Sequence, residues 1–426
     1  MLGGLQQAFK IGDLRSKVLF TLIMFAVFRL GCHIPVPGIN LKAVEALASS
    51  SNFLSFFDVI AGGAFKRFSI FAMSITPYIN ASIIMQLLTV VIPSLEKMSK
   101  EGDEGRKKIT QYTRYGTVVL GFIQAMGIAY AFSRSTSSAG RLMYEPGILS
   151  VLMVAVILTA GTALLMWIGE MITEKGIGNG ISLIIFAGIV ARIPSGISNI
   201  WQTVTKGDAN PFSALLMLVL ALAVIVFVIM LNEGQRRLPV QYAKRVVGRK
   251  VYGGQSTFLP IRVNMAGVIP IIFAMSITMF PATIASWLPK TNWFAQAINT
   301  YFSMGGWAYN ILYAILIFGF TFFYTAIIFN PVDVADNIKK YGGFVPGIRP
   351  GRPTAEYIDK VLVRLTVAGG VALAFIAVLP SLFMAFTGFN IYFGGTALLI
   401  VVGVALDTMK QMEAHLLLRS YEGFVK

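Results

Sequence analysis

Residues 148–169, ILSVLMVAVILTAGTALLMWIG, contain no charged side chain. A helix needs about 20 apolar residues to cross the roughly 30 Å hydrocarbon core of a bilayer, so this run is long enough to span a membrane. The whole chain has the same character, because 56% of its 426 residues are hydrophobic and only 13% are charged. A soluble domain carries about 25% charged residues. The composition therefore excludes a soluble multidomain enzyme and a disordered chain.

Similar apolar runs occur along the whole sequence and predict an all-α polytopic membrane protein. Ten transmembrane spans are expected, at 18–34, 72–92, 115–133, 148–169, 180–200, 212–231, 265–287, 308–329, 361–383 and 391–409. An even number of spans places both termini on the same side of the membrane. The first span is followed by His33-Ile34-Pro35 rather than by small residues, so we expect no cleavable signal peptide.

Lysine and arginine residues are distributed unequally between the two sides of the membrane. The side that holds the termini carries 26 of the 35, the opposite side carries 8, and Arg29 lies inside the first span. Cytoplasmic loops of membrane proteins are enriched in Lys and Arg. We therefore expect both termini to be cytoplasmic.

Two long loops hold half of this cytoplasmic positive charge. They are residues 232–262 and 330–364, and they are punctuated by hydrophobic, Gly and Pro residues. One interpretation is topology signalling plus attraction to anionic lipid, at about 1 kcal/mol per Lys or Arg. The other is a docking surface for RNA or for an acidic protein, which the length and the internal order of the loops favour.

Several segments are poor membrane anchors. Residues 53–65, FLSFFDVIAGGAF, are apolar but too short to cross the bilayer, which predicts a re-entrant or plug-like helix. Pro77, Asn80 and Gln86 interrupt the second span, and Asn264 precedes Pro270 and Pro281 in the seventh. Any one of these features is explained by helix packing. Together they favour a water-lined path between the spans, because broken backbone at membrane depth is tolerated where it lines water or is buried in protein.

The interiors of the spans contain almost no ionisable residues, and the sequence contains no catalytic motif. Ion and proton pathways are marked by ionisable groups at membrane depth, whereas an apolar constriction has no chemical preference for what passes. Neither a metalloprotease, a nucleophile-elbow nor a phosphate-loop motif is present, and the chain has only two histidines and one cysteine, Cys32. We therefore expect no enzymatic activity, no cofactor and no metal.

Five segments resemble the signature sequences of the SecY family. They are TPYINASIIMQLLTVVIPSLEKMSKEGDEGRKKITQYTRYGT (76–117), EKGIGNGISLIIFAGI (174–189), YAKRVVGRKVYGGQSTFLPIRVNMAGVIPIIFAMSI (242–277), FVPGIRPGRPTAEYIDKV (344–361) and GGTALLIVV (394–402). The resemblance implies a channel subunit that translocates unfolded secretory polypeptides across the bacterial cytoplasmic membrane and releases signal and membrane helices laterally. It also implies two inverted five-span halves, here roughly 1–205 and 206–426.

The resemblance further implies a pore closed by an apolar ring and a plug. The ring would consist of Ile75, Ile79, Ile181, Ile185, Ile272 and Ile400. Two pairs within it are four residues apart, which places both members on one helix face. The plug would lie near 57–66 and include Phe57, Val59, Ile60, Gly62 and Gly63.

A lateral gate and a set of partners are also implied. The gate lies between span 2 and spans 7 and 8, where we expect Asn80, Gln86 and Asn264. Arg249, Lys250 and Arg349 would contact the ribosome or the SecA motor ATPase. Small SecE-like and SecG-like membrane subunits, signal sequences and the lipid bilayer complete the expected partners.

The alternative function is a secondary transporter for a small solute. Ten spans, broken helices and an internal repeat would suit it. A coupled transporter should, however, carry charged residues at the midpoints of its spans, and these spans lack them. An intramembrane enzyme is disfavoured because no nucleophile or metal motif is present.

Overall fold

The computed structural model describes residues 12–50, 58, 61–137, 140–206, 211–242, 245–247, 250–252, 256–287, 293, 296–298, 306–387 and 395–425. The principal helices are α2 (Gly12–Gly31), α3 (Leu41–Ser50), α5 (Thr76–Val91), α6 (Pro93–Lys100), α7 (Asp103–Arg134), α8 (Ile148–Lys175), α9 (Gly180–Val190), α10 (Ile193–Thr205), α11 (Pro211–Glu233), α12 (Ile269–Trp287), α14 (Trp307–Ile328), α15 (Pro331–Lys340), α16 (Arg352–Thr387) and α17 (Gly395–Val425). The strands are β1 (Thr136–Ser137), β2 (Gly140–Arg141), β3 (Gln235–Tyr242), β4 (Arg245–Val247), β5 (Lys250–Tyr252), β6 (Ser256–Arg262) and β7 (Gly343–Phe344).

Each of the ten predicted spans falls on a helix. Within the described residues, six helices are long and apolar enough to cross a membrane, and α5 with α6 makes a seventh if that bent pair is one span. The other three predicted spans lie on α2, α12 and α17. The expectation of a helical, polytopic membrane protein is confirmed.

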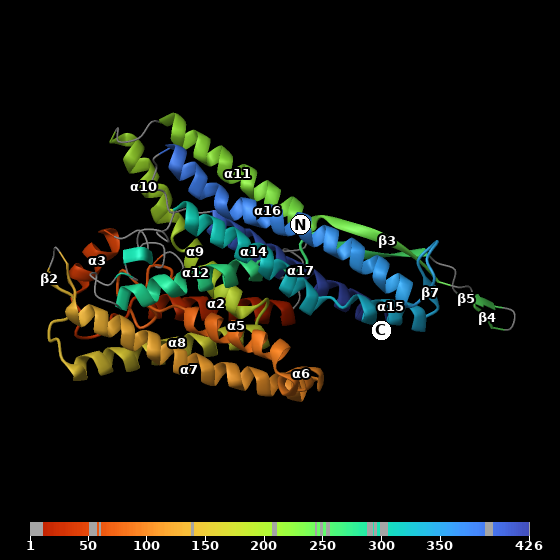
Figure 1. The fold of residues 1–426 in the computed structure, drawn as a ribbon, viewed down its shortest axis with the longest axis horizontal. Helices are drawn as coiled ribbons and strands as arrows, with labels where there is room; N and C mark the ends of the chain where they lie inside the picture. The colour runs from red at the N-terminus through yellow and green to blue at the C-terminus, as the bar shows by residue number, and fades with distance from the viewer. Residues whose placement is uncertain are drawn as a thin grey trace.

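The helices pack into a bundle in which neighbours in sequence are also neighbours in space (Figure 1). Among the earlier helices, α7 packs along both α5 and α8, and among the later helices α14 packs along both α12 and α16. The two sets meet where α12 contacts α5 and α7, and where α17 contacts α9. The contact of α12 with α5 brings together the second and seventh predicted spans.

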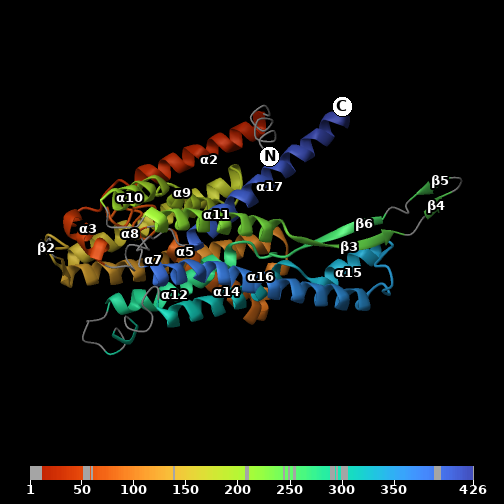
Figure 2. The same cartoon turned by 90° about the horizontal axis from the view of Figure 1, so that it is seen from above.

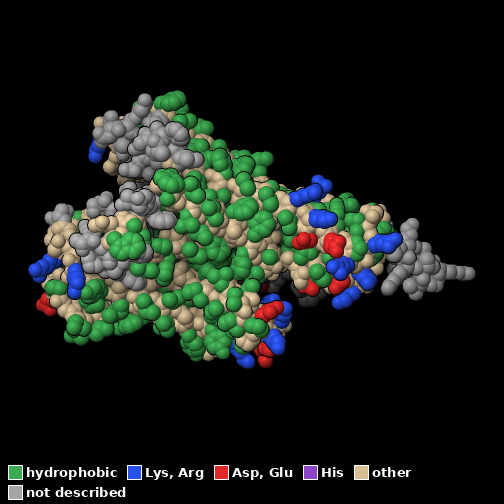
Figure 3. Space-filling model, viewed as in Figure 1, with side chains coloured by type: hydrophobic (Ala, Val, Ile, Leu, Met, Phe, Trp, Pro, Cys, Tyr) green, Lys and Arg blue, Asp and Glu red, His purple; other side chains and the backbone are tan. Residues whose placement is uncertain are grey.

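The outer surface of the bundle is apolar. Leu218, Val219, Leu222 and Val226 of α11 are all exposed, and hydrophobic side chains cover most of the helical body in Figure 3. A soluble monomer rarely exposes apolar patches of this extent. The surface is that of a protein whose solvent is the hydrocarbon of a bilayer.

A small sheet projects from one end of the bundle (Figure 2). Antiparallel strands β3, β6 and β7, in the order β6-β3-β7, pack with α15 and the start of α16, and we call this assembly the sheet unit. It has a separate apolar core made of Leu238, Val240, Ile261, Ile338, Ile358 and Leu362. The first residues of α2 and the last residues of α17 point toward the same end of the molecule.

The sheet unit lies within the two basic loops, for which no strands were predicted. Along β3, Leu238 and Val240 are buried while Arg237, Pro239 and Gln241 are exposed. This period-two alternation is that of a strand with one buried face. The loops are therefore ordered by a sheet, and the helical expectation holds for the bundle.

A sharp bend separates α5 from α6. The two helix axes differ by 100° at Ile92, which has an extended backbone with φ −98° and ψ 112°. Pro93 follows, and the ring of a proline disfavours the helical conformation at the residue before it. The bend thus has a local cause in the sequence.

Candidate functional site

A segment of turns, residues 61–75, lies between α3 and α5, and we call it the turn segment. Ala61, Ala64, Phe65 and Phe68 are buried in the main apolar core of the bundle. The predicted plug, 57–66, overlaps its first part. Phe57, Val59 and Ile60 lie outside the described residues, and 61–66 form turns rather than the expected helix.

The second part of the turn segment is fixed by backbone contacts. The Val36 N–H donates to the Phe68 carbonyl over 2.9 Å, and the Ile70 N–H donates to the Ile34 carbonyl over 3.0 Å. Helix α8 also packs very closely, because a Cβ added at Gly161 would lie 1.9 Å from the Ile70 carbonyl oxygen. Residues 68–71 are therefore held by their own backbone.

The first part of the turn segment is held by side chains. Asp58 is fully buried, and its carboxylate pairs with Arg192 at the end of α9 and accepts a hydrogen bond from the Lys66 N–H over 2.7 Å. The Arg29 guanidinium donates to the Gly62 carbonyl over 2.7 Å. Neither Asp58 nor Arg192 was predicted to have a role, although Asp58 is visible in the sequence as an aspartate inside an apolar segment.

The six isoleucines of the predicted ring all lie in or against the main apolar core. Ile75, Ile79, Ile185, Ile272 and Ile400 are buried, with at most 5% of any one exposed. Ile79 lies in α5 and Ile75 directly precedes it, while the other three come from α9, α12 and α17. The same core includes Ala61 and Ala64 of the turn segment.

Ile181 differs from the other five because it is only half-buried at the edge of this core. Its Cδ1 lies 2.8 Å from the position that a Cβ at Gly169 would occupy. The end of this side chain therefore packs on α8.

The predicted gate residues have different neighbours. Gln86 donates to the Ser82 hydroxyl over 3.2 Å, and its side chain lies near the Tyr324 hydroxyl on α14. This contact joins the second and eighth spans. Tyr324 in turn packs edge-on against Phe273 of α12, with ring centroids 5.6 Å apart. Asn80 is half-buried on α5.

Asn264 is directed to a different helix. Its amide nitrogen donates to Asn232 Oδ1 of α11 over 2.9 Å and to the Gly267 carbonyl over 3.1 Å. It is buried, and its Oδ1 has no hydrogen-bond partner among the described residues. The structure thus places Gln86 near Tyr324 of α14, and places Asn264 between α11 and the start of α12.

The predicted docking residues lie at the end of the molecule that holds the sheet unit. Arg349 is exposed in the loop after β7, where its carbonyl accepts a hydrogen bond from the Thr354 hydroxyl over 2.8 Å. Lys250 lies in β5, and Arg249 lies outside the described residues. Arg236, Arg237 and Arg262 are exposed on β3 and β6. In Figure 3 charged side chains are concentrated at this end of the molecule.

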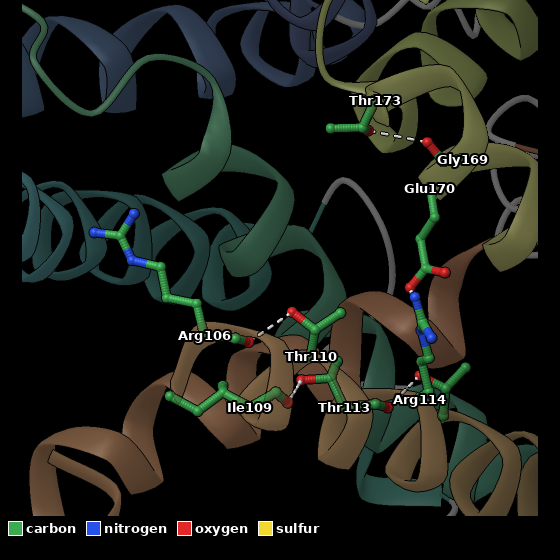
Figure 4. A network of polar contacts seen from close by, with 9 residues as sticks. Arg106, Ile109, Thr110, Thr113, Arg114, Gly169, Glu170 and Thr173 are labelled. Atoms are coloured by element: carbon green, nitrogen blue, oxygen red, sulfur yellow. Dashed lines mark hydrogen bonds and ion pairs between the residues drawn. The ribbon is translucent and has the colours of Figure 1, made fainter. Parts of the chain in front are cut away.

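A second ion pair, between Arg114 and Glu170, links α7 to α8 (Figure 4). The Arg114 Nε lies 2.8 Å from the Glu170 Oε1. The neighbouring hydroxyls of Thr110, Thr113 and Thr173 instead donate to carbonyls of their own helices. This pair does not contact the turn segment.

Comparison with a family model and with curated relatives identifies the sequence family. The SecY family model matches residues 69–409. The chain belongs to the SecY family. The SecY translocase subunit of Halalkalibacterium halodurans is 50% identical over 98% of both chains. That of Escherichia coli is 49% identical over 98% of this chain and 95% of the relative.

Solved structures agree on the fold of this SecY family member. A protein-conducting channel has a TM-score of 0.69 with 18% identity, covering 94% of this chain and 92% of the other. Sec61 in a canine ribosome–channel complex has a TM-score of 0.65 with 17% identity, covering 94% and 92%. As a SecY, the chain is a multi-pass membrane protein and the protein-conducting channel subunit of a translocase, and it is not an enzyme. This result overturns the alternative of a solute transporter.

Proposed function

We propose that this protein conducts unfolded secretory polypeptides through the centre of its helix bundle, across the bacterial cytoplasmic membrane and with both termini in the cytoplasm. The observation that carries the proposal is the burial of five isoleucines, contributed by four parts of the bundle, in one core together with the turn segment. The concentration of Lys and Arg on the side of the termini supports the orientation.

The isoleucine ring seals the channel by an apolar mechanism. Ile75, Ile79, Ile185, Ile272 and Ile400 offer no charge and no hydrogen bond, so they contact any polypeptide equally and disfavour water and ions between them. Ile181 contributes at the edge of the ring. Residues 57–66 act as the plug and leave the centre of the bundle before a polypeptide enters it.

The channel opens sideways by separation of its two halves, 1–205 and 206–426. The gate lies along α5 on one side and along α12 and α14 on the other, and the contact of α5 with α12 supports this assignment. Gln86 acts through its contact with Tyr324. Asn264 acts indirectly, by fixing the start of α12 to α11, and Asn80 faces the seam from α5.

External partners supply the energy for transport. The sheet unit, the β4–β5 hairpin and Arg349 form a basic surface for the ribosome or for the SecA motor. Arg249 and Lys250 belong to the same loop. An arginine suits RNA phosphate or a carboxylate because its planar guanidinium donates two parallel hydrogen bonds. SecE-like and SecG-like subunits cover part of the apolar outer face.

The test is export by the purified complex in proteoliposomes. The chain is reconstituted with the SecE-like and SecG-like subunits and with the SecA motor, and a radiolabelled preprotein with a signal sequence is added with ATP. We expect the preprotein to become protected from protease in the lumen. A version without the signal sequence is the matched control, and equal protection of both, or protection of neither, would contradict the proposal.

A further inference from the structure

The carboxylate of Asp58, three residues before the turn segment, is fully buried. One of its oxygens accepts from the Lys66 N–H over 2.7 Å, and the other pairs with the Arg192 guanidinium. A buried carboxylate is strongly unfavourable without a partner, and removing one member of a buried pair is strongly destabilising. Arg192 is 24% exposed, so the pair lies at the edge of the core with water on the arginine side.

Asp58 is also bound to the turn segment by hydrogen bonds. Its carbonyl accepts from the Gly63 N–H over 2.9 Å, while its side chain accepts from the Lys66 N–H over 2.7 Å. Arg29 of α2 holds the same part of the chain by donating to the Gly62 carbonyl over 2.7 Å.

The two parts of the turn segment are thus held in different ways. Residues 68–70 are tied by backbone hydrogen bonds to residues 34–36 of the loop after α2. In the first part, Gly62 is bound by Arg29, the neighbouring Asp58 is bound by Arg192, and Ala61, Ala64 and Phe65 pack in the apolar core. The first part can therefore leave its position when these two side-chain contacts break and its apolar residues leave the core, while the backbone bonds at 68–70 keep its far end in place.

We propose that Asp58 and Arg192 form a latch that holds the plug in the closed channel and releases it when α9 moves outward. The proposal rests on the proposed function of residues 57–66 as the plug. Arg192 lies between α9, the helix that carries Ile185, and α10, and its N–H donates to the Ile189 carbonyl of α9 over 3.0 Å. A polypeptide that pushes α9 away from the centre therefore also draws Arg192 away from Asp58.

The latch suits a reversible movement. A buried ion pair contributes little net stability, because desolvation offsets the attraction between the charges. When the plug leaves the core, both charges regain water. Displacement of the plug alone would leave Arg192 without its partner, so the pair opposes that movement. The pair opposes less strongly an opening in which the plug and α9 move together.

The experiment compares three latch variants with one control in the complete complex with its small subunits. The variants are Asp58→Asn, Arg192→Gln and the double substitution, and the control is Arg114→Gln, which breaks the Arg114–Glu170 pair away from the plug. The measurement is the open probability of the resting channel in planar bilayers, without preprotein. We expect each single variant to raise it about tenfold, the double variant to exceed neither single one, and the control to match the wild type.

A second measurement is independent of conductance. In a Cys32→Ser background, Gly63→Cys provides a thiol on the plug at a position where the part of the chain that the structure describes has no heavy atom within 4 Å of the Cβ. A membrane-impermeant maleimide should label it faster in Arg192→Gln than in the Arg192 background, and labelling at the same rate would overturn the latch.

The outcomes separate the latch from the proposed function. If the wild-type complex exports a preprotein while Asp58→Asn shows the resting conductance of the wild type, the latch alone is overturned. Additive effects in the double variant would also overturn it, because the two residues would then act separately. Failure of the wild-type complex to export any preprotein would overturn the proposed function and the latch with it.

Discussion

Gly62 of the turn segment lies against Gly188 of α9, so closely that a Cβ at Gly62 would come within 2.8 Å of the Gly188 Cα. Two backbones meet here without side chains between them. Gly62 also has a φ of +66°, which L-residues rarely adopt. The contact places the predicted plug directly on the helix that carries Ile185.

The first prediction follows from this contact. Gly62→Ala should displace the plug from α9 and raise the resting conductance of the reconstituted complex several-fold, since the methyl group meets backbone that has little room to move. Gly63→Ala is the matched control, because Gly63 has a φ of +88° but no atom of the described residues within 4 Å of its Cβ. Both glycines have a positive φ, so equal conductance would contradict the role of the Gly62–Gly188 contact.

The second prediction concerns the packing of α8 on the turn segment. Gly161→Ala places a methyl group 1.9 Å from the Ile70 carbonyl oxygen and should destabilise the protein by about 1–3 kcal/mol through overpacking. Gly319→Ala in α14 meets no atom within 4 Å among the described residues and should be neutral or stabilise the helix by up to about 1 kcal/mol. Thermal unfolding of the purified complex in detergent measures both, and a stable Gly161→Ala would be inconsistent with this packing.

The third prediction concerns the isoleucine ring. Ile185→Gly, Ile79→Gly and Ile400→Gly should each let the resting channel conduct ions, because they open space in a fully packed apolar core. Ile181→Gly should have a weaker effect, since the end of Ile181 packs on Gly169 of α8. Planar-bilayer recordings give the ranking, and a leak through Ile181→Gly as large as that through Ile185→Gly would contradict it.

The fourth prediction concerns the gate. Gln86→Leu removes the contact with Tyr324 and should change the signal-sequence hydrophobicity needed for export. Tyr324→Phe removes the same contact from the other side, so it should have a similar effect, and the double variant should not exceed either single one. The measurement is export of a series of preproteins with graded signal sequences, and an unchanged threshold would reject the assignment.

The fifth prediction concerns Asn264. Asn264→Leu should destabilise the protein by about 1–3 kcal/mol, because it leaves the Asn232 side chain and the Gly267 carbonyl without their donor. Asn232→Leu should cost a similar amount, while Asn80→Leu should cost less, as Asn80 is half-buried. Thermal unfolding compares the three variants. Equal stability of all three would mean that the link between α11 and α12 contributes nothing.

The membrane-spanning helices were predictable because their signal is local and long. Residues 148–169 identify α8 without reference to any other part of the chain, and Pro93 marks the bend that ends α5. The strands of the sheet unit were not predicted, although Leu238 and Val240 alternate with polar residues. The partner strand of β3 is β6, which pairs Leu238 with Leu259, and such pairing between separate segments is not visible in a local pattern.

The candidate site was predictable in its apolar part and not in its polar part. The isoleucines of the ring were predictable because their motifs resemble those of the SecY family. The four-residue spacing within two pairs places both members of each pair on one helix face. Asp58 and Arg192 are 134 residues apart in the sequence, so no spacing rule brings them together. The neighbours of Asn264 were equally hidden, because the sequence does not say whether an amide at the start of a span faces α5 or α11.

The length of α16 connects the two ends of this molecule mechanically. It runs for 36 residues, or about 54 Å at 1.5 Å per residue, from the core of the sheet unit to the far side of the bundle, and it packs along α14 on the way. A partner that pulls on the sheet unit therefore applies its load to a stiff lever. Tilting α16 by a few degrees would shift α14, against which it packs.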